Sequence, residues 1–337
     1  MKKEMDLYSD YLLSSFSRVT ATGLSSLLEG TVSHDKITRM LSVNTYNSKD
    51  LWQEAKPLVR QYESEAACLI FDDAIVSKPY TDENELIGWH RDHSKDRNEK
   101  GINLLTAFYH TQLPGSFEAL RVPVAFECVK KTFRLCDIKN RKEKLQSPVT
   151  KNEMMRSMLQ QSVEKQYLKF CYVLTDSWSS SSDNLLFIAG LKKYFVMDMK
   201  SNRLCMFSTQ DRNRGEWTSM DKLPLQAELP VQVWIKDLET EVLLCKFVFT
   251  NKDGSTGEMY LLSNDLELSA EDFRTLYKKR WSVEEYHKSL KQNASLAKSP
   301  TRTVTTQTSH LFASLLAYIK PERLKFIHRL NHFCSEI

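Results

Sequence analysis

The order of apolar segments between residues 66 and 199 restricts the fold more than any other feature of the sequence. The run Ala66–Asp72 and the segments INLLTAFYHT and VPVAFECVK have the length and apolar content of three successive strands. Residues 150–166 follow a helical pattern, and the segments KFCYVLTD, SSDNLLFIAGL and KYFVMDM then read as strand, helix and strand. This order predicts an α/β fold, a mixed sheet with helices on both faces.

Two aspartates lie where predicted strands end. Asp73 follows the first strand, and Asp176 follows the fourth. In a sheet of this order these strands are neighbours, and neighbouring strands lie about 4.8 Å apart. The carboxylates of Asp73 and Asp176 are therefore expected to lie close together. Asp72 is the alternative for the first position.

A helix is predicted over Ser269–Lys291, and Ser269 and Asp272 have the spacing of a capping box at its start. The signature Y-x2-R-x3-E-x6-K within it is formed by Tyr277, Arg280, Glu284 and Lys291. On one continuous helix, at about 100° per residue, these side chains fall within an arc of about 60°. The alternative is a solvated helix face with an i,i+4 ion pair.

These segments resemble the catalytic blocks of insertion-sequence DDE transposases, in the group named for its Y-R-E-K signature (the insertion-sequence-four family). LIFDDAIVSKPY around Asp73 and CYVLTDSW around Asp176 are similar to the family's other two blocks, and the resemblance extends from about Cys68 to about Ser309. It implies an RNase H-like fold, which the order of elements also favours. It further implies an enzyme that cuts insertion-sequence ends and joins them to target DNA through a hairpin intermediate.

The resemblance assigns catalysis and metal binding to Asp73, Asp176 and Glu284. The family's first aspartate directly precedes a small, usually hydroxylated residue, which selects Asp73 over Asp72, although Ala74 departs from the common threonine. Carboxylate oxygens suit Mg²⁺, and two such ions can activate a nucleophile and neutralise a leaving oxygen. Two Mg²⁺ ions are therefore expected, with Mn²⁺ as a substitute.

DNA contacts are implied for the rest of the signature. Tyr277, Arg280 and Lys291 correspond to residues that contact phosphate near the cut. Trp281 corresponds to an aromatic residue that takes part in base flipping, and an exposed indole suits stacking on a base. An aromatic residue of a β-rich insertion stacks the flipped base in the family; Tyr260 is the best match and Trp234 the second.

Four regions follow from these patterns. Residues 1–63 form a helical DNA-binding region, 64–200 the first part of the RNase H-like core, 201–264 a β-rich insertion, and 265–337 the last catalytic helix with a helical tail. In the first region Gly30 separates two helices, and Ser33 caps the second one, which carries Lys36 and Arg39. This spacing is compatible with a helix-turn-helix on DNA, and an ordinary helical hairpin is the alternative.

Composition adds limits rather than a function. The hydrophobic content of 41% and charged content of 27% are typical of a globular protein, and the net charge of +4 neither requires nor excludes nucleic acid. No apolar run is long enough for a membrane span, and the polar start MKKEMDLYSD argues against a signal peptide. The seven cysteines are scattered without a CxxC pair, which favours reduced thiols over zinc.

The expected protein is a bacterial, cytoplasmic transposase that joins the nucleoid when bound to DNA. Its expected partners are double-stranded terminal inverted repeats, target DNA and a second copy of itself. Three alternatives stay open: a catalytically silent DNA-binding descendant, a structure-specific RNase H-like nuclease, and a scaffold that binds no nucleic acid.

Overall fold

The computed structural model describes residues 3–15, 17–92, 95–113, 118–137, 142–207, 215–238, 240–251 and 253–328. The chain forms two compact units. Unit 1 combines Met1–Tyr62, Asp73–Met158 and Glu284–Ile337, and unit 2 combines Glu63–Asp72 with Leu159–Val283. The boundaries fall inside a strand, inside a helix and close to the start of another helix, so each unit is assembled from distant parts of the sequence.

Unit 1 begins with four helices, α1 (Lys3–Ser14), α2 (Ala21–Leu27), α3 (His34–Val43) and α4 (Ser48–Tyr62). The Ser33 side chain accepts a hydrogen bond from the backbone N of Lys36 and caps α3 as predicted. Gly30 adopts a φ of +76° between α2 and α3, a conformation that glycine takes without steric cost.

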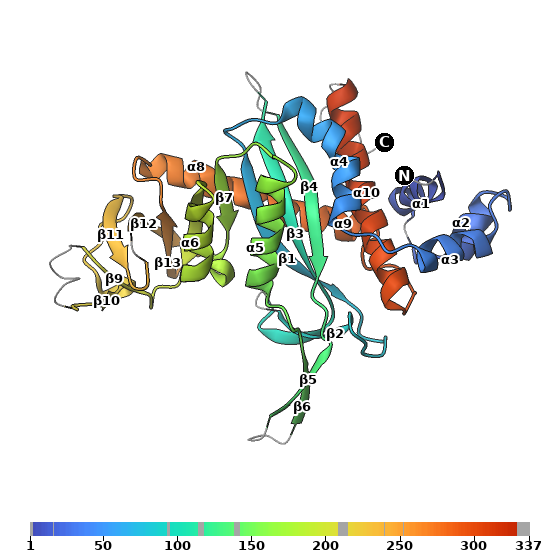
Figure 1. The fold of residues 1–337 in the computed structure, drawn as a ribbon, viewed down its shortest axis with the longest axis horizontal. Helices are drawn as coiled ribbons and strands as arrows, with labels where there is room; N and C mark the ends of the chain where they lie inside the picture. Colours follow the sequence, from blue (N-terminus) through green and yellow to red (C-terminus); the bar gives the residue numbers. More distant parts are fainter. Residues whose placement is uncertain are drawn as a thin grey trace. The chain divides into compact units, whose positions relative to one another are not determined.

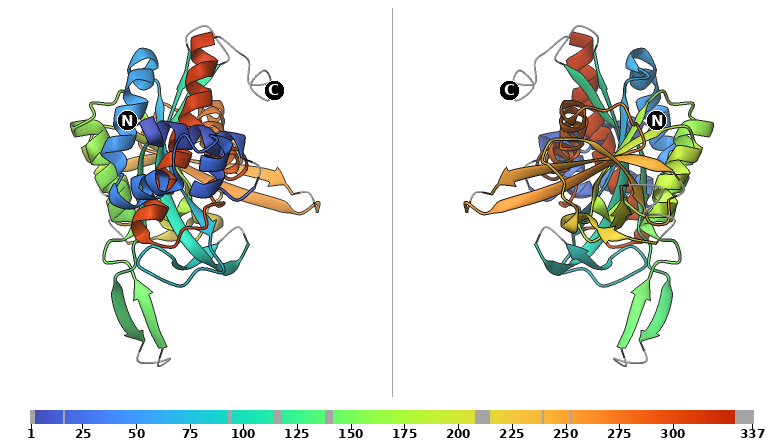
Figure 2. Two further views of the ribbon diagram at one scale, coloured as in Figure 1. Left: turned by 90° about the vertical axis from the view of Figure 1, so that its right-hand side faces the viewer. Right: turned by 90° about the vertical axis from the view of Figure 1, so that its left-hand side faces the viewer.

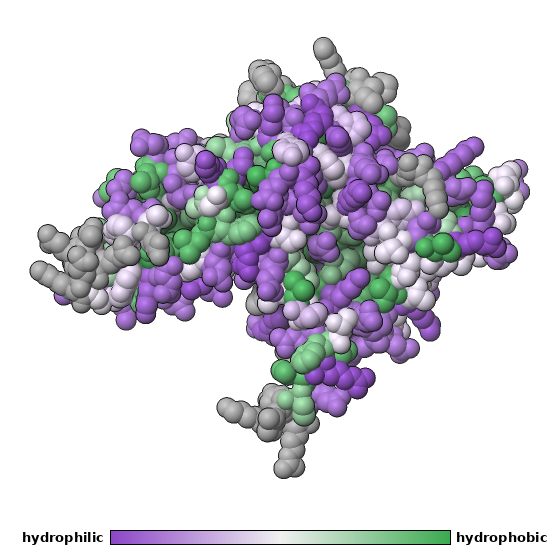
Figure 3. Space-filling view, viewed as in Figure 1, coloured by the Kyte–Doolittle hydropathy of each residue, from purple (hydrophilic) through white to green (hydrophobic). Residues whose placement is uncertain are grey.

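The strands of unit 1 include three antiparallel pairs, which join the second strand to the third, the third to the fourth and the fifth to the sixth. The strands are the second half of β1 (Cys68–Ser77), β2 (Gly88–Asp92), β3 (Arg97–Gln112), β4 (Ala119–Cys128) and a separate hairpin, β5 (Phe133–Asp137) with β6 (Lys142–Gln146). The long helix α10 (Val304–His328) packs against β4 and α4, as Figure 1 shows. The β5–β6 hairpin exposes Phe133 and Leu135, and green atoms mark it in Figure 3.

Unit 2 contains the remaining described strands. They are β7 (Tyr172–Thr175), β8 (Tyr194–Met199), β9 (Leu204–Met206), β10 (Thr218–Ser219), β11 (Val231–Ile235), β12 (Glu241–Thr250) and β13 (Thr256–Ser263). Their order is β10-β9-β11-β12-β13-β8-β7-β1, with parallel pairs β8–β7 and β7–β1 and antiparallel pairs elsewhere. Figure 2 shows β12 and β13 as a long hairpin in orange.

The helical elements of unit 2 are short. They are the end of α5 (Lys151–Glu164), the 3-10 turn η1 (Ser177–Ser179), α6 (Ser182–Gly190), the 3-10 turn η2 (Met220–Lys222) and α8 (Ala270–Arg280). The strands predicted for residues 201–264 continue the sheet of this unit, because β13 pairs with β8 over Tyr260–Ser263. Both units together give the mixed α/β fold with a large sheet that the sequence predicts.

The helix predicted over Ser269–Lys291 is present, but it is interrupted at one residue. The segment forms α8 and then α9 (Ser282–Gln292), with Trp281 as the C-cap of α8. The Trp281 backbone N–H donates to the carbonyls of Lys278 and Lys279, which is the tightened turn of a helix end. The predicted capping box is confirmed, because Ser269 and Asp272 each accept from the other's backbone N–H.

The helix α9 is held in unit 1 by aromatic packing. Tyr286 is 1% exposed, and its ring stacks on Phe108 of β3 with centroids 4.5 Å apart. The ring of Tyr318 in α10 meets Tyr286 edge-on at 4.8 Å. Val283 and Leu290 of the same helix are also fully buried. These contacts fix the helix that carries Glu284.

No helix among the described residues combines the length and hydropathy that crossing a bilayer requires. The six cysteines with described positions are free thiols, and four of them are buried as expected for core residues: Cys68, Cys128, Cys205 and Cys245.

Candidate active site

Asp73 lies within strand β1 rather than at its end. The strand continues to Ser77, so the sequence prediction ended it too early. The apolar run stops at Phe71, but Ala74 and Val76 are buried and extend the pattern beyond the two aspartates. The boundary between the two units falls between these aspartates, with Asp72 in unit 2 and Asp73 in unit 1. The choice between Asp72 and Asp73 as catalytic residue stays a prediction.

Both oxygens of Asp73 are engaged. The Asn103 amide donates to Oδ2 at 2.5 Å, and the Lys151 ammonium lies 2.8 Å from Oδ1. The Asp73 side chain is only 14% exposed, so these charge-assisted bonds are partly shielded from water. Asn103 and Lys151 were missed at the sequence level, because neither lies near Asp73 in the chain and neither belongs to a motif.

Helix α5 brings Lys151 to Asp73. Thr150 and Glu153 cap its start, since the Thr150 N–H donates to Glu153 at 2.7 Å and the Glu153 N–H donates to Thr150 at 3.2 Å. The first turn of a helix disfavours a cation, because the backbone N–H groups give that end positive potential. The carboxylate of Asp73 offsets this repulsion at Lys151.

Two buried histidines also feel the charge of Asp73. Burial, together with Lys291, lowers the pKa of His287 to about 3, and Asp73 acts in the opposite direction. Burial and the neighbouring Lys131 lower the pKa of His90 to about 4, again opposed by Asp73. Both imidazoles are therefore neutral at pH 7. The charged groups near them are Asp73 and the lysines Lys131, Lys151 and Lys291.

Asp176 directly follows β7, as predicted, and its side chain accepts a hydrogen bond of 3.2 Å from the backbone N of Trp178. The strand β7 pairs with the start of β1 in parallel, with Ile70 opposite Leu174. The predicted neighbourhood of the first and fourth strands is therefore confirmed within unit 2.

A second carboxylate, Asp198 of β8, lies near Asp176. Burial, and after it the charge of Asp176, raise the pKa of Asp198 to about 6, although Arg280 acts in the opposite direction. Burial is the largest cause, so the ionised form of Asp198 is less stable here than in water, and a bound cation would favour that form. Sequence reasoning missed Asp198, although a lone aspartate inside the apolar segment KYFVMDM is a signal that could have found it.

Tyr277 and Arg280 of α8 face this pair of carboxylates. The Arg280 guanidinium lies 5.0 Å from the centroid of the Tyr277 ring, and both residues are buried. Burial raises the pKa of the Tyr277 phenol, Arg280 lowers it, and Asp198 and Asp176 raise it. Trp281 is 57% exposed and lies 5.8 Å from the guanidinium, so its indole is accessible as predicted.

Glu284 and Lys291 lie on α9 in unit 1, and both side chains are exposed. The helix break at Trp281 separates them from Tyr277 and Arg280, which belong to unit 2. The predicted single stripe of four side chains depended on an unbroken helix, so it no longer follows from helical geometry.

The proposed stacking residues of the β-rich segment are less accessible. Tyr260 is 2% exposed, its hydroxyl donates to Glu258 at 2.6 Å, and the Lys246 ammonium lies 5.8 Å from its ring. Stacking of a base on Tyr260 would require this arrangement to open. Trp234 is half-buried in β11, opposite Met206 and Glu241. Their role in stacking stays a prediction.

The N-terminal residues predicted to contact DNA lie on α3. Lys36 is exposed and forms an ion pair of 2.8 Å with Glu4 of α1, and Arg39 is exposed on the same helix. An exposed ion pair of this kind contributes little to stability, so Lys36 can exchange Glu4 for a phosphate at small cost.

The carboxylates suit a divalent cation individually. Asp73 already pairs with an ammonium group, and the carboxylate of Asp198 lies near that of Asp176 and near the guanidinium of Arg280. No three His, Cys, Asp or Glu side chains with described positions form a group that could hold a metal ion. Asp73 and Glu284 belong to unit 1 and Asp176 to unit 2, so the three-carboxylate site stays a prediction.

Comparison with known protein families decides the class of enzyme. Residues 148–320, half of the chain, match the transposase DDE domain. The chain belongs to the DDE transposase family. The matched part includes Asp176, the Y-R-E-K signature and Asp198, and it begins after Asp73. A search of curated proteins finds no match.

Membership makes the chain an enzyme of DNA recombination, an endonuclease that cuts DNA strands and transfers them. Its substrate is DNA, and enzymes of this family generally use divalent metal ions. Carboxylate oxygens are common ligands of such ions, and cationic side chains commonly contact DNA phosphates. Both kinds of residue are present in the described parts of the two units.

Asn103 and Lys151 are expected to act on metal binding by the transposase in opposite directions. If Asp73 is a metal ligand, replacing Asn103 by alanine frees its carboxylate to rotate and should weaken Mn²⁺ binding by about 10- to 100-fold. Lys151→Met removes a cation that competes for the same carboxylate and should strengthen Mn²⁺ binding. Titration of the full chain, followed by electron paramagnetic resonance of free Mn²⁺, measures both changes.

The control is Asn98→Ala, which truncates an exposed asparagine on the same strand. It should leave Mn²⁺ affinity unchanged. If Asn103→Ala and Asn98→Ala have equal affinities, Asn103 does not orient a metal ligand.

Proposed function

We propose that this transposase belongs to the Y-R-E-K group, the insertion-sequence-four family, and that it moves a bacterial insertion sequence. One observation carries the proposal: Asp176, Tyr277 and Arg280 share one electrostatic environment in unit 2. A carboxylate, a phenol and a guanidinium together can hold a metal and the phosphate beside it. The same three residues have the order and spacing expected for the group.

In this proposal Asp73, Asp176 and Glu284 hold two Mg²⁺ ions, for which Mn²⁺ can substitute. When bound, the ions supply an activated nucleophile and neutralise the charge on the leaving oxygen. Asn103 keeps the Asp73 carboxylate in one orientation, and Lys151 balances its charge before metal binds. Glu284 is exposed on a helix fixed by Tyr286, so it is accessible to DNA and metal.

The remaining residues of the signature hold DNA. Arg280 lies against the rings of Tyr277 and Trp281, which restricts its guanidinium to a few orientations for a bidentate contact with phosphate. Lys291 is exposed and can contact a second phosphate. The exposed indole of Trp281 can stack on a base that leaves the duplex, which is the step that permits a hairpin.

The N-terminal region of residues 1–63 binds the terminal inverted repeats through Lys36 and Arg39. Both side chains are exposed on α3, the second helix of a helical pair. The transposase acts as a homodimer, so that two repeat ends are held together when they are joined to target DNA. It works in the bacterial cytoplasm and associates with the nucleoid through DNA.

Product analysis on DNA that carries the repeats flanking the coding sequence tests this function. With Mg²⁺, the full chain should give nicked, hairpin and strand-joined products on a denaturing gel. The Trp281→Ala variant should nick normally and lose most of the hairpin, because the flipped base loses a stacking partner worth about 1–3 kcal/mol. Trp89→Ala is the matched control, since this indole on β2 is 53% exposed.

The outcomes separate the alternatives. Hydrolysis without any joined product identifies a structure-specific nuclease. Repeat binding without cleavage identifies a silent descendant. Equal hairpin yields from Trp281→Ala and Trp89→Ala contradict the role of Trp281.

A further inference from the structure

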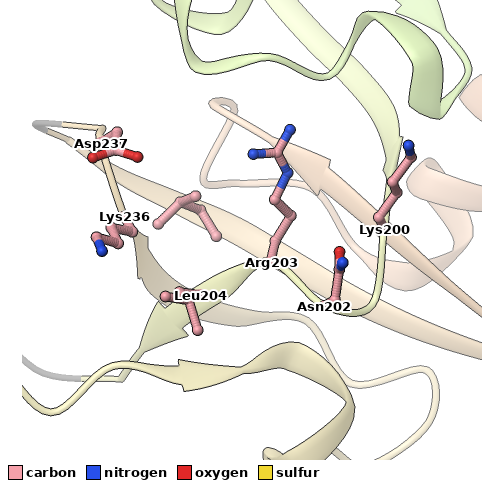
Figure 4. Close-up of a pocket in the computed structure, with 7 residues that line it drawn as sticks. Lys200, Asn202, Arg203, Leu204, Lys236 and Asp237 are labelled. Carbon is pink, nitrogen blue, oxygen red and sulfur yellow. The ribbon is translucent and has the colours of Figure 1, made fainter. Parts of the chain in front are cut away.

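A basic hollow lies in unit 2, and none of the residues that line it belongs to the Y-R-E-K signature. It has a volume of about 470 Å³ and is formed by the turn between β8 and β9 and by the end of β11. Figure 4 shows its lining, which consists of Lys200, Asn202, Arg203, Leu204, Ile235, Lys236 and Asp237.

Backbone hydrogen bonds shape this hollow. The N–H of Arg203 donates to the carbonyl of Lys200 at 3.0 Å and closes the turn after β8. The N–H of Lys236 donates to the carbonyl of Leu204 at 2.9 Å, which ties the two sides together beyond the last β11–β9 pair. The left-handed backbone at Asp237, with a φ of +71°, then turns the chain away. The hollow is therefore a defined feature of the backbone.

The charge of the hollow is positive and not compensated. Lys200, Arg203 and Lys236 are exposed, and within the described residues none of them forms an ion pair. Asp237 is the one acidic side chain in the lining. In Figure 4 the Arg203 side chain stands between Lys200 and Asp237, with its guanidinium directed into the open space.

The side chains of the lining indicate which kind of ligand the hollow can bind. Only Leu204 and Ile235 are apolar, so the lining does not suit an apolar molecule. A guanidinium flanked by two flexible ammonium groups suits phosphate oxygens, and such contacts carry no sequence information. DNA is the substrate of the family, and its phosphodiester backbone presents such oxygens.

We propose that Lys200, Arg203 and Lys236 bind the DNA backbone independently of sequence, so that the β-rich part of unit 2 is a second DNA-holding surface of the transposase. The proposal rests on DNA as the substrate of the family. It does not depend on which carboxylates cut the DNA.

Salt dependence of DNA binding tests the proposal. Fluorescence anisotropy would measure the affinity of the full chain for a duplex of arbitrary sequence between about 50 and 200 mM KCl. EDTA in the buffer removes divalent metal ions and so prevents cleavage. Each phosphate contact contributes about 0.9 to the slope of log K against log salt. Replacing Lys200, Arg203 and Lys236 by alanine should therefore lower the magnitude of the slope by about 2 to 3.

The control replaces Lys165, Lys169 and Lys192 by alanine, since these lysines of unit 2 are exposed and lie outside the hollow. It removes the same net charge and should change the slope by less than about 1. Arg203→Lys keeps the charge and should retain the slope of the wild type. Thermal melting of every variant establishes that its fold is intact.

Equal slopes for the hollow and control variants would overturn the proposal, because net charge alone would then explain binding. The Glu284→Gln variant separates this result from the proposed function. It should keep the full slope, so a failure of cleavage and a failure of this surface are recognised independently.

Discussion

Replacing Glu284 by glutamine is expected to reduce strand cleavage with Mg²⁺ or Mn²⁺ by at least about 10³-fold. The amide keeps the size of the side chain and loses the negative charge that a metal ligand needs. Metal ions supply several kcal/mol of transition-state stabilisation, and each loss of about 1.4 kcal/mol lowers the rate tenfold. A time course of nicking on repeat DNA measures the rate, and anisotropy in EDTA should show unchanged DNA binding.

Glu285→Gln is the matched control. Glu285 is the next residue on α9, and its 74% exposed side chain pairs with Arg121 at 3.0 Å. An exposed pair contributes little to stability, so this variant should cleave at nearly the wild-type rate. Cleavage by Glu284→Gln at the rate of Glu285→Gln would remove Glu284 from the active site.

Replacing Tyr286 by alanine is expected to lower the free energy of unfolding of the transposase by about 3–5 kcal/mol, the range for a large buried aromatic residue. The ring is 1% exposed and packs between Phe108 and Tyr318, so its loss leaves a cavity beneath the helix of Glu284. Urea unfolding followed by circular dichroism measures the change. Cleavage should also fall, because Glu284 loses its fixed support.

Tyr286→Phe is the control, since it keeps the ring and both aromatic contacts. It should retain most of the stability and the cleavage rate. If Tyr286→Ala is as stable as Tyr286→Phe, the aromatic packing does not hold α9 in place.

Local signals in the sequence predicted local structure well. Ser33 and Ser269 cap helices where their spacing placed them, because a side-chain cap requires only residues within one turn. The strands around Leu174 and Tyr260 were found because apolar runs of that length fit a buried sheet.

The helix break at Trp281 left no such signal. The residues on both sides of it fit one helical period, and neither glycine nor proline interrupts the segment. The α8 side packs in unit 2 and the α9 side in unit 1, so tertiary contacts override the local pattern. Periodicity cannot report contacts with residues that are distant in the sequence.

The candidate site could be predicted only in part, because several of its contacts join residues that are distant in the sequence. Asp176 lies after its strand as expected, and the family match includes it with Glu284. The partners of Asp73, which are Asn103 and Lys151, come from β3 and α5, and Asp198 comes from β8. None of them has a fixed spacing from the residue that it affects, so only the fold brings them together.

Cleavage of the polypeptide by bound iron tests the central claim most directly. Fe²⁺ replaces Mg²⁺ on the full chain with DNA, and ascorbate with peroxide then generates hydroxyl radicals that cut the backbone near the ion. If Asp73, Asp176 and Glu284 share the metal site, cuts should fall near all three residues, and excess Mg²⁺ should suppress all of them together. Cuts near only one of the three residues would contradict a shared metal site.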